Sequence, residues 1–400
     1  MNPVAARLSF AYSFTGLANG AFTPFFGAWL AWRGLDAAEI GVLMGAGLLL
    51  RVGVLPLTGV IADARNDRRG MMVQLYALVF TGYAALNFVR APELIFAAAI
   101  LSYVANGAAS PLLESVSMRL ARHFGFDYGH VRLWASCLFV AGNLVSGVAV
   151  SFLGLGVIAP WLVAAMFGNL VAAVMLPRPK PGANHNLAAD LRAVWMQAGE
   201  LIRNRVFLIA LLAASLTQGS HAFYYSIGGL HMARLGYSGA LIGILWPLGV
   251  LPEILFFVYS RKIFAMFGAG KLLLIGAVAS VLRWSIMALD PGLAMTAFAQ
   301  LLHGATYALA HLGAMYFIAE AIPARLAATA QSLYAVFWSG LAMGLATLAS
   351  GALYASFGGA TYLLMAVMGI AAAIASLALM RMWHGRYLTR DAGPEIYDTI

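Results

Sequence analysis

The chain has 400 residues, of which 62% are hydrophobic and only 10% are charged, with a mean hydropathy of +0.85. Soluble domains have an apolar fraction closer to half, so this composition excludes a soluble globular protein and indicates an integral membrane protein. The single cysteine, Cys137, excludes an intramolecular disulfide. HExxH, GxSxG, CxxC and P-loop patterns are absent from the sequence, which argues against an enzyme.

Apolar runs long enough to cross a bilayer follow one another along the chain. A helix needs roughly 20 apolar residues to span the hydrocarbon core. Twelve runs meet this length, at approximately residues 8–32, 40–62, 71–89, 94–118, 131–152, 157–176, 206–233, 240–260, 272–289, 293–319, 327–348 and 360–380. They predict an all-α integral membrane protein with twelve transmembrane helices.

The basic residues are distributed unevenly between the loops. If the N-terminus is cytoplasmic, 18 Lys and Arg residues lie in cytoplasmic segments, and only Arg33, Arg90 and Arg234 lie outside. This is the positive-inside pattern, so both termini are expected in the cytoplasm. The net charge of +9 therefore reflects topology in a lipid bilayer and does not indicate a nucleic-acid partner.

One long polar interval, residues 176–205, separates six runs from six. The predicted organisation is an N-terminal bundle at 1–176, a cytoplasmic linker at 177–204, a C-terminal bundle at 205–382 and a cytoplasmic tail at 383–400. Shifting one half by 202 positions aligns residues 33–51 with 235–253 without a gap, so Gly34 meets Gly236 and Arg51 meets Glu253. A second alignment, offset by 197, pairs Glu114 with His311. Such duplication is typical of transporters and predicts two pseudo-symmetric six-helix bundles.

Ionisable side chains inside the runs are few, and charge at membrane depth usually serves function. The set is Arg51, Glu114, Arg132, His221, Glu253, Arg283, His303 and His311. Polar residues at helical spacing form four stripes, Tyr12–Thr15–Asn19, Asn106–Ser110–Glu114, Gln218–His221–Tyr225 and Gln300–His303–Tyr307–His311. The stripes predict a shared polar cavity. The structural alternatives are a buried ion pair between Glu114 and Arg132, and histidines that only satisfy hydrogen bonds to neighbouring helices.

The formal charge of this set favours an anionic substrate. Three arginines and two glutamates leave +1 with neutral histidines, which an anion would balance. A monoanion entering alone against an inside-negative potential is opposed by about 2.3 kcal/mol per 100 mV, and a proton moving with it removes this cost. Glu253 is the predicted proton carrier because Glu114 is expected to pair with Arg132. His303 is the second candidate, since histidine titrates in the physiological range.

Two stretches resemble a known family. "GVIADARNDRR", Gly59 to Arg69, resembles the loop signature of the major facilitator superfamily, with Gly59, Asp63 and Arg68 in place and Asn66 near the expected glycine. "PLLESVSMRLARHFGFDYGHVRLWASC" resembles the lactose permease and 3-phenylpropionic acid permease groups, in which an acid on helix four and an arginine on helix five face the substrate. Glu114 and Arg132 match these positions with the same separation.

The similarity to the phenylpropionic acid permeases extends to residues 218–257, 283–289 and 300–319. Lactose permease carries Lys, His and Glu in the proton pathway of its tenth helix, whereas the matching positions here are Gln300, His303 and Thr306. Because only the histidine is retained, galactoside transport is not expected, and Glu253 is the better proton site.

The resemblance implies a proton-coupled symporter of a small organic acid, which could be aromatic, in a bacterial inner membrane, functional as a monomer without cofactor or metal. The predicted substrate-binding residues are Glu114, Arg132, Arg51, Asn19, His221, Tyr225, His311 and Trp134; Glu253, His303 and Arg283 are predicted to couple protons; Gly59, Asp63 and Arg68 form the predicted gating loop. The alternatives are transport of another solute in the same fold, such as an oligosaccharide, nucleoside or peptide, and proton-driven export. A membrane enzyme or a sensor is a more distant alternative, although the tail is too short for an output domain.

Overall fold

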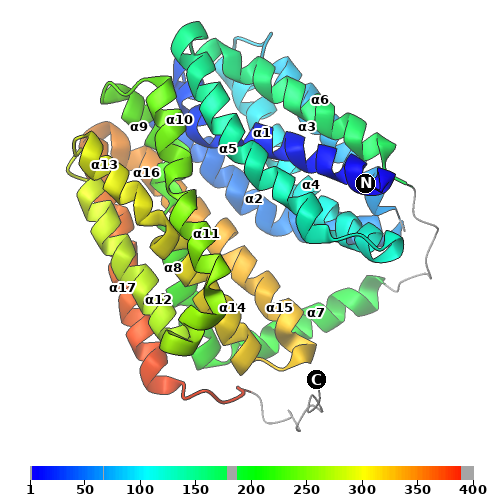
Figure 1. Ribbon diagram of the computed structural model, residues 1–400, viewed down its shortest axis with the longest axis vertical. Coiled ribbons are helices and arrows are strands. Elements are labelled where there is room, and N and C mark those ends of the chain that lie inside the picture. Colours follow the sequence, from blue (N-terminus) through cyan, green and yellow to red (C-terminus); the bar gives the residue numbers. More distant parts are fainter. Residues whose placement is uncertain (1, 66, 178–186, 389–400) are drawn as a thin grey trace. The chain divides into compact units, whose positions relative to one another are not determined.

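The computed structural model describes residues 2–65, 67–177 and 187–388, and within these ranges all regular secondary structure is helical. In chain order the elements are α1 (Pro3–Trp32), α2 (Ala37–Ala64), α3 (Arg68–Ala85), α4 (Pro92–Phe124), α5 (Tyr128–Leu153), η1 (Leu155–Val157), α6 (Ile158–Met175), α7 (Leu187–Ile202), α8 (Arg205–Gly219), η2 (Tyr224–Gly228), α9 (Gly229–Arg234), α10 (Gly239–Leu248), α11 (Val250–Val258), α12 (Ser260–Met287), α13 (Leu293–Leu301), η3 (Gly304–Leu309), α14 (Ala310–Ala321), α15 (Ala324–Ala335), η4 (Val336–Ala342), α16 (Met343–Phe357), η5 (Gly358–Thr361) and α17 (Tyr362–Met382) (Figure 1).

Each predicted apolar run overlaps one helix or consecutive helices, although the run at 272–289 covers only the later part of α12 and the run at 327–348 ends inside α16. The run at 206–233 corresponds to α8, η2 and α9, and the run at 293–319 corresponds to α13, η3 and α14. In the described part of the chain, eight helical stretches are long and apolar enough to cross a membrane by length and composition. Segments η2, η3 and η4 are π-helical turns, which insert an extra residue and are frequent at functional sites. Parts of the predicted linker and tail, at 178–186 and 389–400, lie outside the described residues.

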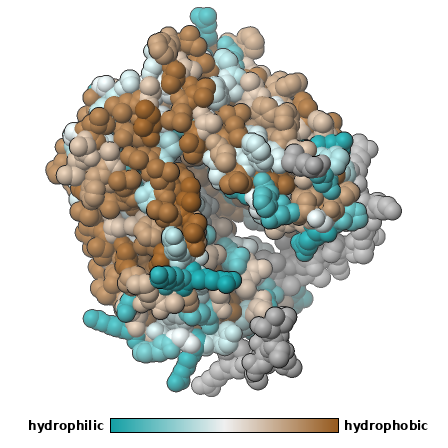
Figure 2. Space-filling view, viewed as in Figure 1, coloured by the Kyte–Doolittle hydropathy of each residue, from teal (hydrophilic) through white to brown (hydrophobic). Residues whose placement is uncertain are grey.

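Large apolar side chains on several helices point outward. Phe152 on α5, Val258 on α11 and Ile374 on α17 have exposed fractions of 84%, 68% and 63%. Apolar residues also cover much of the surface visible in Figure 2. Exposure on this scale is unfavourable in water and expected in lipid, which confirms an all-α integral membrane fold.

The chain divides into two compact units. Unit 1 contains Met1–Leu187, Ala222–Leu248 and Gly344–Gly359, and unit 2 contains Ala188–His221, Gly249–Met343 and Ala360–Ile400. In unit 1, α1 packs on α5 and α6, and α3 packs on α4 and α6. In unit 2, α12 and α8 pack on α17, and α14 packs on α12. This division follows compactness, whereas the predicted domain boundaries follow the sequence repeat and stay a prediction.

The two copies of the sequence repeat have the same backbone pattern where they align. The turn after α1 has Gly34 at φ +98°, and the N–H of Leu35 donates to the carbonyl of Leu30 at 3.1 Å. The turn after α9 has Gly236 at φ +87°, and the N–H of Tyr237 donates to the carbonyl of Met232 at 3.1 Å. All of these positions are related by the offset of 202. Glycine is needed at both turns because a side chain at this φ is strained.

The next helices of the two copies also begin alike. Asp36 caps α2 by accepting from the N–H of Glu39 at 2.8 Å. At the corresponding position before α10, the hydroxyl of Ser238 accepts from the N–H of Leu241 at 3.2 Å. Side-chain oxygens at a helix N-cap satisfy donors that have no partner within the helix. The internal repeat is therefore present in local structure as well as in sequence.

Within unit 1, α1 crosses η2 and α9 with its backbone nearly touching theirs. A Cβ added at Gly27 would lie 2.0 Å from the carbonyl oxygen of Ser226, and one added at Gly229 would lie 1.7 Å from the carbonyl oxygen of Pro24. The pairs Pro24/Ser226 and Gly27/Gly229 are again separated by 202 positions. This reciprocal contact, called the α1–α9 crossing below, tolerates only glycine at both points.

Candidate functional site

Glu114 on α4 collects three donors in unit 1. Its carboxylate accepts from the hydroxyl of Tyr12 at 2.9 Å, from Nε of Arg132 at 3.0 Å, and from the hydroxyl of Tyr128. The guanidinium of Arg132 lies 5.5 Å from the ring centroid of Tyr12. The predicted pairing of Glu114 with Arg132 is present, and two tyrosines hold the carboxylate in place.

The turn between α4 and α5 explains how residues so far apart in sequence meet. Gly125 ends α4 in the left-handed region at φ +67°, and Asp127 caps α5 by accepting from the N–H of Gly129 at 2.7 Å. The same hydrogen bond holds the pKa of the Asp127 carboxyl below its ordinary value. Because α5 begins directly after this tight turn, Tyr128 and Arg132 lie in its first turns and point back to α4. Arg132 is thus near a helix end rather than at mid-span.

Arg51 occupies a separate place in unit 1. Its guanidinium carbon lies 3.8 Å from the ring centroid of Tyr103, and its Nη2 donates to the backbone carbonyl of Tyr103. Tyr103 stacks on Phe22 at 5.4 Å, which extends the contact into a short aromatic column. A Cβ at Gly107 would lie 2.2 Å from Nε of Arg51, so the glycine makes room for the arginine. That Nε atom is buried and has no hydrogen-bond partner among the described residues.

The predicted gating loop lies at the end of α2 and the start of α3, and its Arg68 contacts α4. Nη2 of Arg68 donates to the carboxylate of Asp63 at 2.8 Å, and Nη1 donates to the hydroxyl of Ser115. Ser115 is the residue directly after Glu114. Gly59 lies within α2, where an added Cβ would have no atom of the described chain within 4 Å, so no close contact there requires it. Arg68 therefore links the loop between α2 and α3 to α4 at the residue next to Glu114.

Unit 2 contains a second polar cluster, centred on the fully buried Arg283 of α12. Its guanidinium donates to Nδ1 of His303 at 2.9 Å, to the hydroxyl of Thr306 at 3.1 Å and to the side-chain carbonyl of Gln300 at 3.0 Å. Nε2 of His303 lies 3.6 Å from a carboxylate oxygen of Glu253. The predicted proton-coupling residues are therefore adjacent in space.

Close backbone packing brings Glu253 to His303. A Cβ at Gly249 would lie 2.8 Å from Cβ of His303, and one at Gly304 would lie 2.8 Å from the backbone nitrogen of Glu253. These glycines let α11 approach η3, and the π turn of η3 presents Thr306 to Arg283.

Hydrogen bonding assigns the tautomers of the two buried histidines. An arginine nitrogen can only donate, so Nδ1 of His303 accepts, and its Nε2 carries the hydrogen that points to Glu253. Nδ1 of His221 lies 2.9 Å from the carbonyl of Gln218 and therefore donates, and Nε2 is 3.0 Å from the hydroxyl of Thr306. His221, predicted to bind substrate, thus lies among the predicted proton-coupling residues.

The remaining predicted residues have other surroundings. His311 lies 6.4 Å from Tyr307 with parallel rings, and Tyr307 stacks on His303 at 5.4 Å, so the predicted stripe of the tenth run forms a column in unit 2. Asn19 and Trp134 are exposed on α1 and α5. Tyr225, in η2, is half-buried with its ring 5.8 Å from Tyr224. These last three are not brought to the Glu114 carboxylate.

Sequence reasoning assigned no role to several residues that complete the two clusters. They are Tyr12, Tyr128 and Ser115 in unit 1, and Gln300 and Thr306 in unit 2. Tyr12 and Gln300 are members of the polar stripes, and this membership was the sequence feature that could have identified them as site residues. Gly125 and Asp127 are helix-end signals that would have placed Tyr128 in the first turn of α5.

Ionisable groups gathered inside a membrane-embedded helical protein serve to move solutes or ions. This chain has such groups together with an internal repeat. The combination defines a multi-pass membrane transporter of the major facilitator type. Residues 5–365 match the family described as the MFS_1 like family, and the chain belongs to it.

Curated relatives agree with this class. The chain is 31% identical over 364 residues to a protein of Escherichia coli (strain K12) named "Probable 3-phenylpropionic acid transporter", covering 88% of this chain and 92% of the relative. It is 28% identical to the maltose permease of Geobacillus stearothermophilus, covering 91% of each. These relatives confirm that the chain is a bacterial multi-pass membrane transporter for a small molecule and not an enzyme.

Solved structures confirm the fold. A crystal structure of a point mutant of the nucleoside transporter NupG superposes with a TM-score of 0.81 at 17% identity, covering 95% of this chain and all of the other. A bacterial homologue of the human lysosomal transporter Spinster, in an inward-facing, occupied conformation, superposes with a TM-score of 0.72 at 15% identity, covering 95% and 97%.

Proposed function

We propose that the chain is a secondary active transporter that moves a small organic acid together with a proton by alternating access. The observation that carries the proposal is the environment of Arg132. Its Nε is bonded to Glu114, its two terminal nitrogens make no hydrogen bond within the described residues, and 44% of its side chain is exposed. Two such nitrogens match the two oxygens of a carboxylate. The name of the 31% identical relative supports an aromatic acid.

Arg51 is the second proposed attraction for the anion. Its buried Nε lacks a partner in the described part of the chain, and a carboxylate is the group that would satisfy it. The neighbouring rings of Tyr103 and Phe22 offer a surface on which an aromatic body stacks favourably. His221, His311, Tyr225, Asn19 and Trp134 remain proposed contacts of the substrate.

Glu253 is the proposed proton carrier. His303 is held neutral by the arginine that donates to its Nδ1, because adding a proton there would place two donors against each other. Glu253 faces the Nε2–H of His303 at 3.6 Å and is half-buried, so its carboxyl can gain or lose a proton when solvent access changes. Arg283 and His303 therefore act as positioning residues for this carboxyl.

Proton coupling follows from the charge of the substrate. Transport of a monoanion alone into an inside-negative cell is opposed by about 2.3 kcal/mol per 100 mV, whereas the anion and one proton together carry no net charge. The proposed location is the bacterial inner membrane, with both termini cytoplasmic and the monomer as the functional form. The 18 to 3 distribution of basic residues supports this orientation.

The test is solute-driven pH change in proteoliposomes, with 3-phenylpropionate, maltose and a nucleoside as probes. We expect proton uptake with the aromatic acid only. Arg132→Gln should abolish transport, whereas Arg119→Gln, which removes the same charge from an exposed position on α4, should not.

Glu253→Gln should keep counterflow of the acid but lose proton movement. Proton coupling that survives Glu253→Gln contradicts the assignment of the carrier.

Transport of a sugar is the second candidate, favoured by the 28% identity to a maltose permease. The same panel decides between them, because proton uptake with maltose and none with the acid would assign the chain to the sugar transporters. A proton moving opposite to the solute would indicate export.

A further inference from the structure

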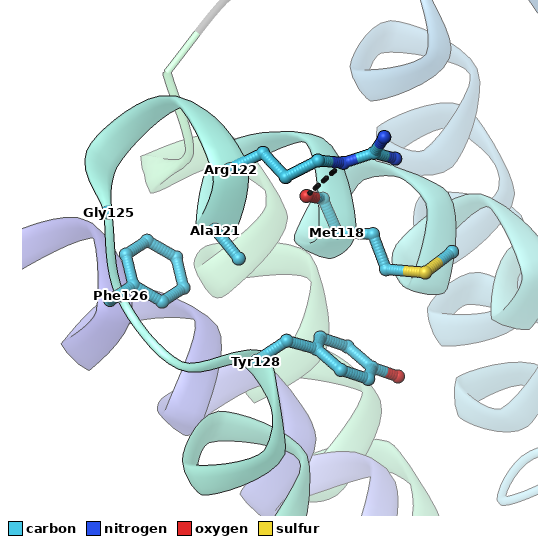
Figure 3. A pocket seen from close by; sticks show the side chains of 6 residues that line it. All are labelled: Met118, Ala121, Arg122, Gly125, Phe126 and Tyr128. Atoms are coloured by element: carbon cyan, nitrogen blue, oxygen red, sulfur yellow. Dashed lines mark hydrogen bonds between the residues drawn. The ribbon is translucent and has the colours of Figure 1, made fainter. Parts of the chain in front are cut away.

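A pocket lies at the turn between α4 and α5. It has a volume of about 440 Å³ and is lined by Met118, Ala121, Arg122, Gly125, Phe126 and Tyr128. Figure 3 shows these side chains around one hollow, with Arg122 and Met118 on one wall and the rings of Phe126 and Tyr128 on the other. The volume lies within the usual range of small-molecule sites, roughly 300–1,000 Å³.

The lining has one cation and is otherwise mostly apolar. Nε of Arg122 donates weakly to the carbonyl of Met118, at 3.4 Å on the same helix, and the two terminal nitrogens make no hydrogen bond within the described residues. Two aromatic rings and a methionine sulfur form the apolar wall. Such a wall stacks with a flat ring, and the guanidinium pairs with a carboxylate. The chemistry therefore fits a small aromatic acid.

One residue of the lining is shared with the Glu114 cluster. The ring of Tyr128 borders the pocket, and its hydroxyl donates to the Glu114 carboxylate. That carboxylate also holds Arg132 at 3.0 Å. A molecule seated against the Tyr128 ring would thus contact a group that positions the proposed substrate-binding pair.

We propose that this pocket is a second binding site, for a small aromatic carboxylate, and that its occupancy acts on Glu114 through Tyr128. The ligand class rests on the proposed function, while the pocket and its link to Glu114 do not. The basic residues of this turn place it on the cytoplasmic side in the predicted topology, so the site samples acid that has already entered. Occupancy of the pocket therefore slows uptake as the internal acid concentration rises.

Equilibrium dialysis of the purified full-length protein against radiolabelled 3-phenylpropionate, in phosphatidylcholine nanodiscs, tests the proposal. We expect two equivalents bound per chain. Arg122→Gln should weaken one of them by about tenfold, because it removes a charge-assisted hydrogen bond. Arg119→Gln, one turn away and outside the pocket, should leave both unchanged. Arg132→Gln should remove the other equivalent.

These variants separate the two proposals. If only the equivalent that depends on Arg122 is found, the pocket exists and the proposed substrate is wrong. One equivalent that is insensitive to Arg122→Gln overturns the pocket assignment. Loss of the Arg122-dependent equivalent when phosphatidylglycerol is added also overturns it, because the pocket then belongs to a lipid headgroup.

Tyr128→Phe tests the link to Glu114. The variant keeps the ring in the pocket and removes the hydroxyl, so binding of the second equivalent should persist. Net proton-driven uptake into vesicles preloaded with 3-phenylpropionate, compared with uptake into empty vesicles, should be slowed more in the wild type than in Tyr128→Phe. Equal slowing in both proteins contradicts the role of Tyr128.

Discussion

Adding one methyl group at Gly229 should force the α1–α9 crossing apart. The new Cβ would lie 1.7 Å from the carbonyl oxygen of Pro24, and a carbon and a carbonyl oxygen in contact need roughly 3.3 Å, so the backbones must separate by about 1.6 Å. Overpacking of this kind costs about 1–3 kcal/mol. Because about 1.4 kcal/mol is tenfold, Gly229→Ala should shift any equilibrium between a packed and an open crossing by roughly 5- to 150-fold.

Alkylation of a cysteine buried at the crossing measures this shift. Ser226→Cys, placed in a Cys137→Ser background, puts a near-isosteric thiol at a buried position in η2. Its rate of reaction with N-ethylmaleimide should rise by the predicted factor in Gly229→Ala. The matched control is Gly53→Ala, because a Cβ there meets no atom of the described residues within 4 Å. An equal rate in the two variants would refute the argument that backbone contact keeps the crossing closed.

Three further variants test the clusters and the linker. Arg132→Lys keeps the charge but loses the planar fork, so binding of 3-phenylpropionate in equilibrium dialysis should weaken by about tenfold although Glu114 is intact. Asp63→Asn removes the ion pair of the gating loop, and initial transport rates should fall by about two- to fivefold with substrate binding unchanged. Arg325 donates to Glu200 at 2.7 Å and holds the pKa of that carboxyl below its ordinary value of 4.5. A lowered pKa in the folded state stabilises the fold above about pH 4.5, and this contribution is lost as the pH falls through the folded value, so Glu200→Gln should lower Tm at neutral pH, and the difference in Tm should shrink as the pH falls below about 4.5.

The helical architecture was predictable from the sequence because its cause is local and additive. Runs of apolar residues have no stable alternative in lipid to forming helices, and the helices follow the predicted runs. The repeat was visible because Gly34 and Gly236 meet a backbone requirement that other residues satisfy poorly. The pairing of Glu114 with Arg132 was predictable because charges at membrane depth need a partner.

Other features depend on packing that sequence patterns do not encode. The π turns η2, η3 and η4 have no composition signature, and η3 sets the position of Thr306 beside Arg283. The tyrosines that donate to Glu114 come from two different helices, and one of them precedes the fifth apolar run. Hydropathy does not detect helix caps, which is why the fifth apolar run was predicted to begin at residue 131, whereas Asp127 caps α5 and the helix begins at Tyr128.

The bond from Arg68 to Ser115 has a mechanical meaning. It clamps the start of α3 to the residue that follows Glu114, while Asp63 holds the same guanidinium from the end of α2. Among the described residues, three helices are thereby joined through one cation. A displacement of the loop would be transmitted through Arg68 to Ser115, the residue after Glu114. The position of the loop and the position of the Glu114 carboxylate would therefore change together.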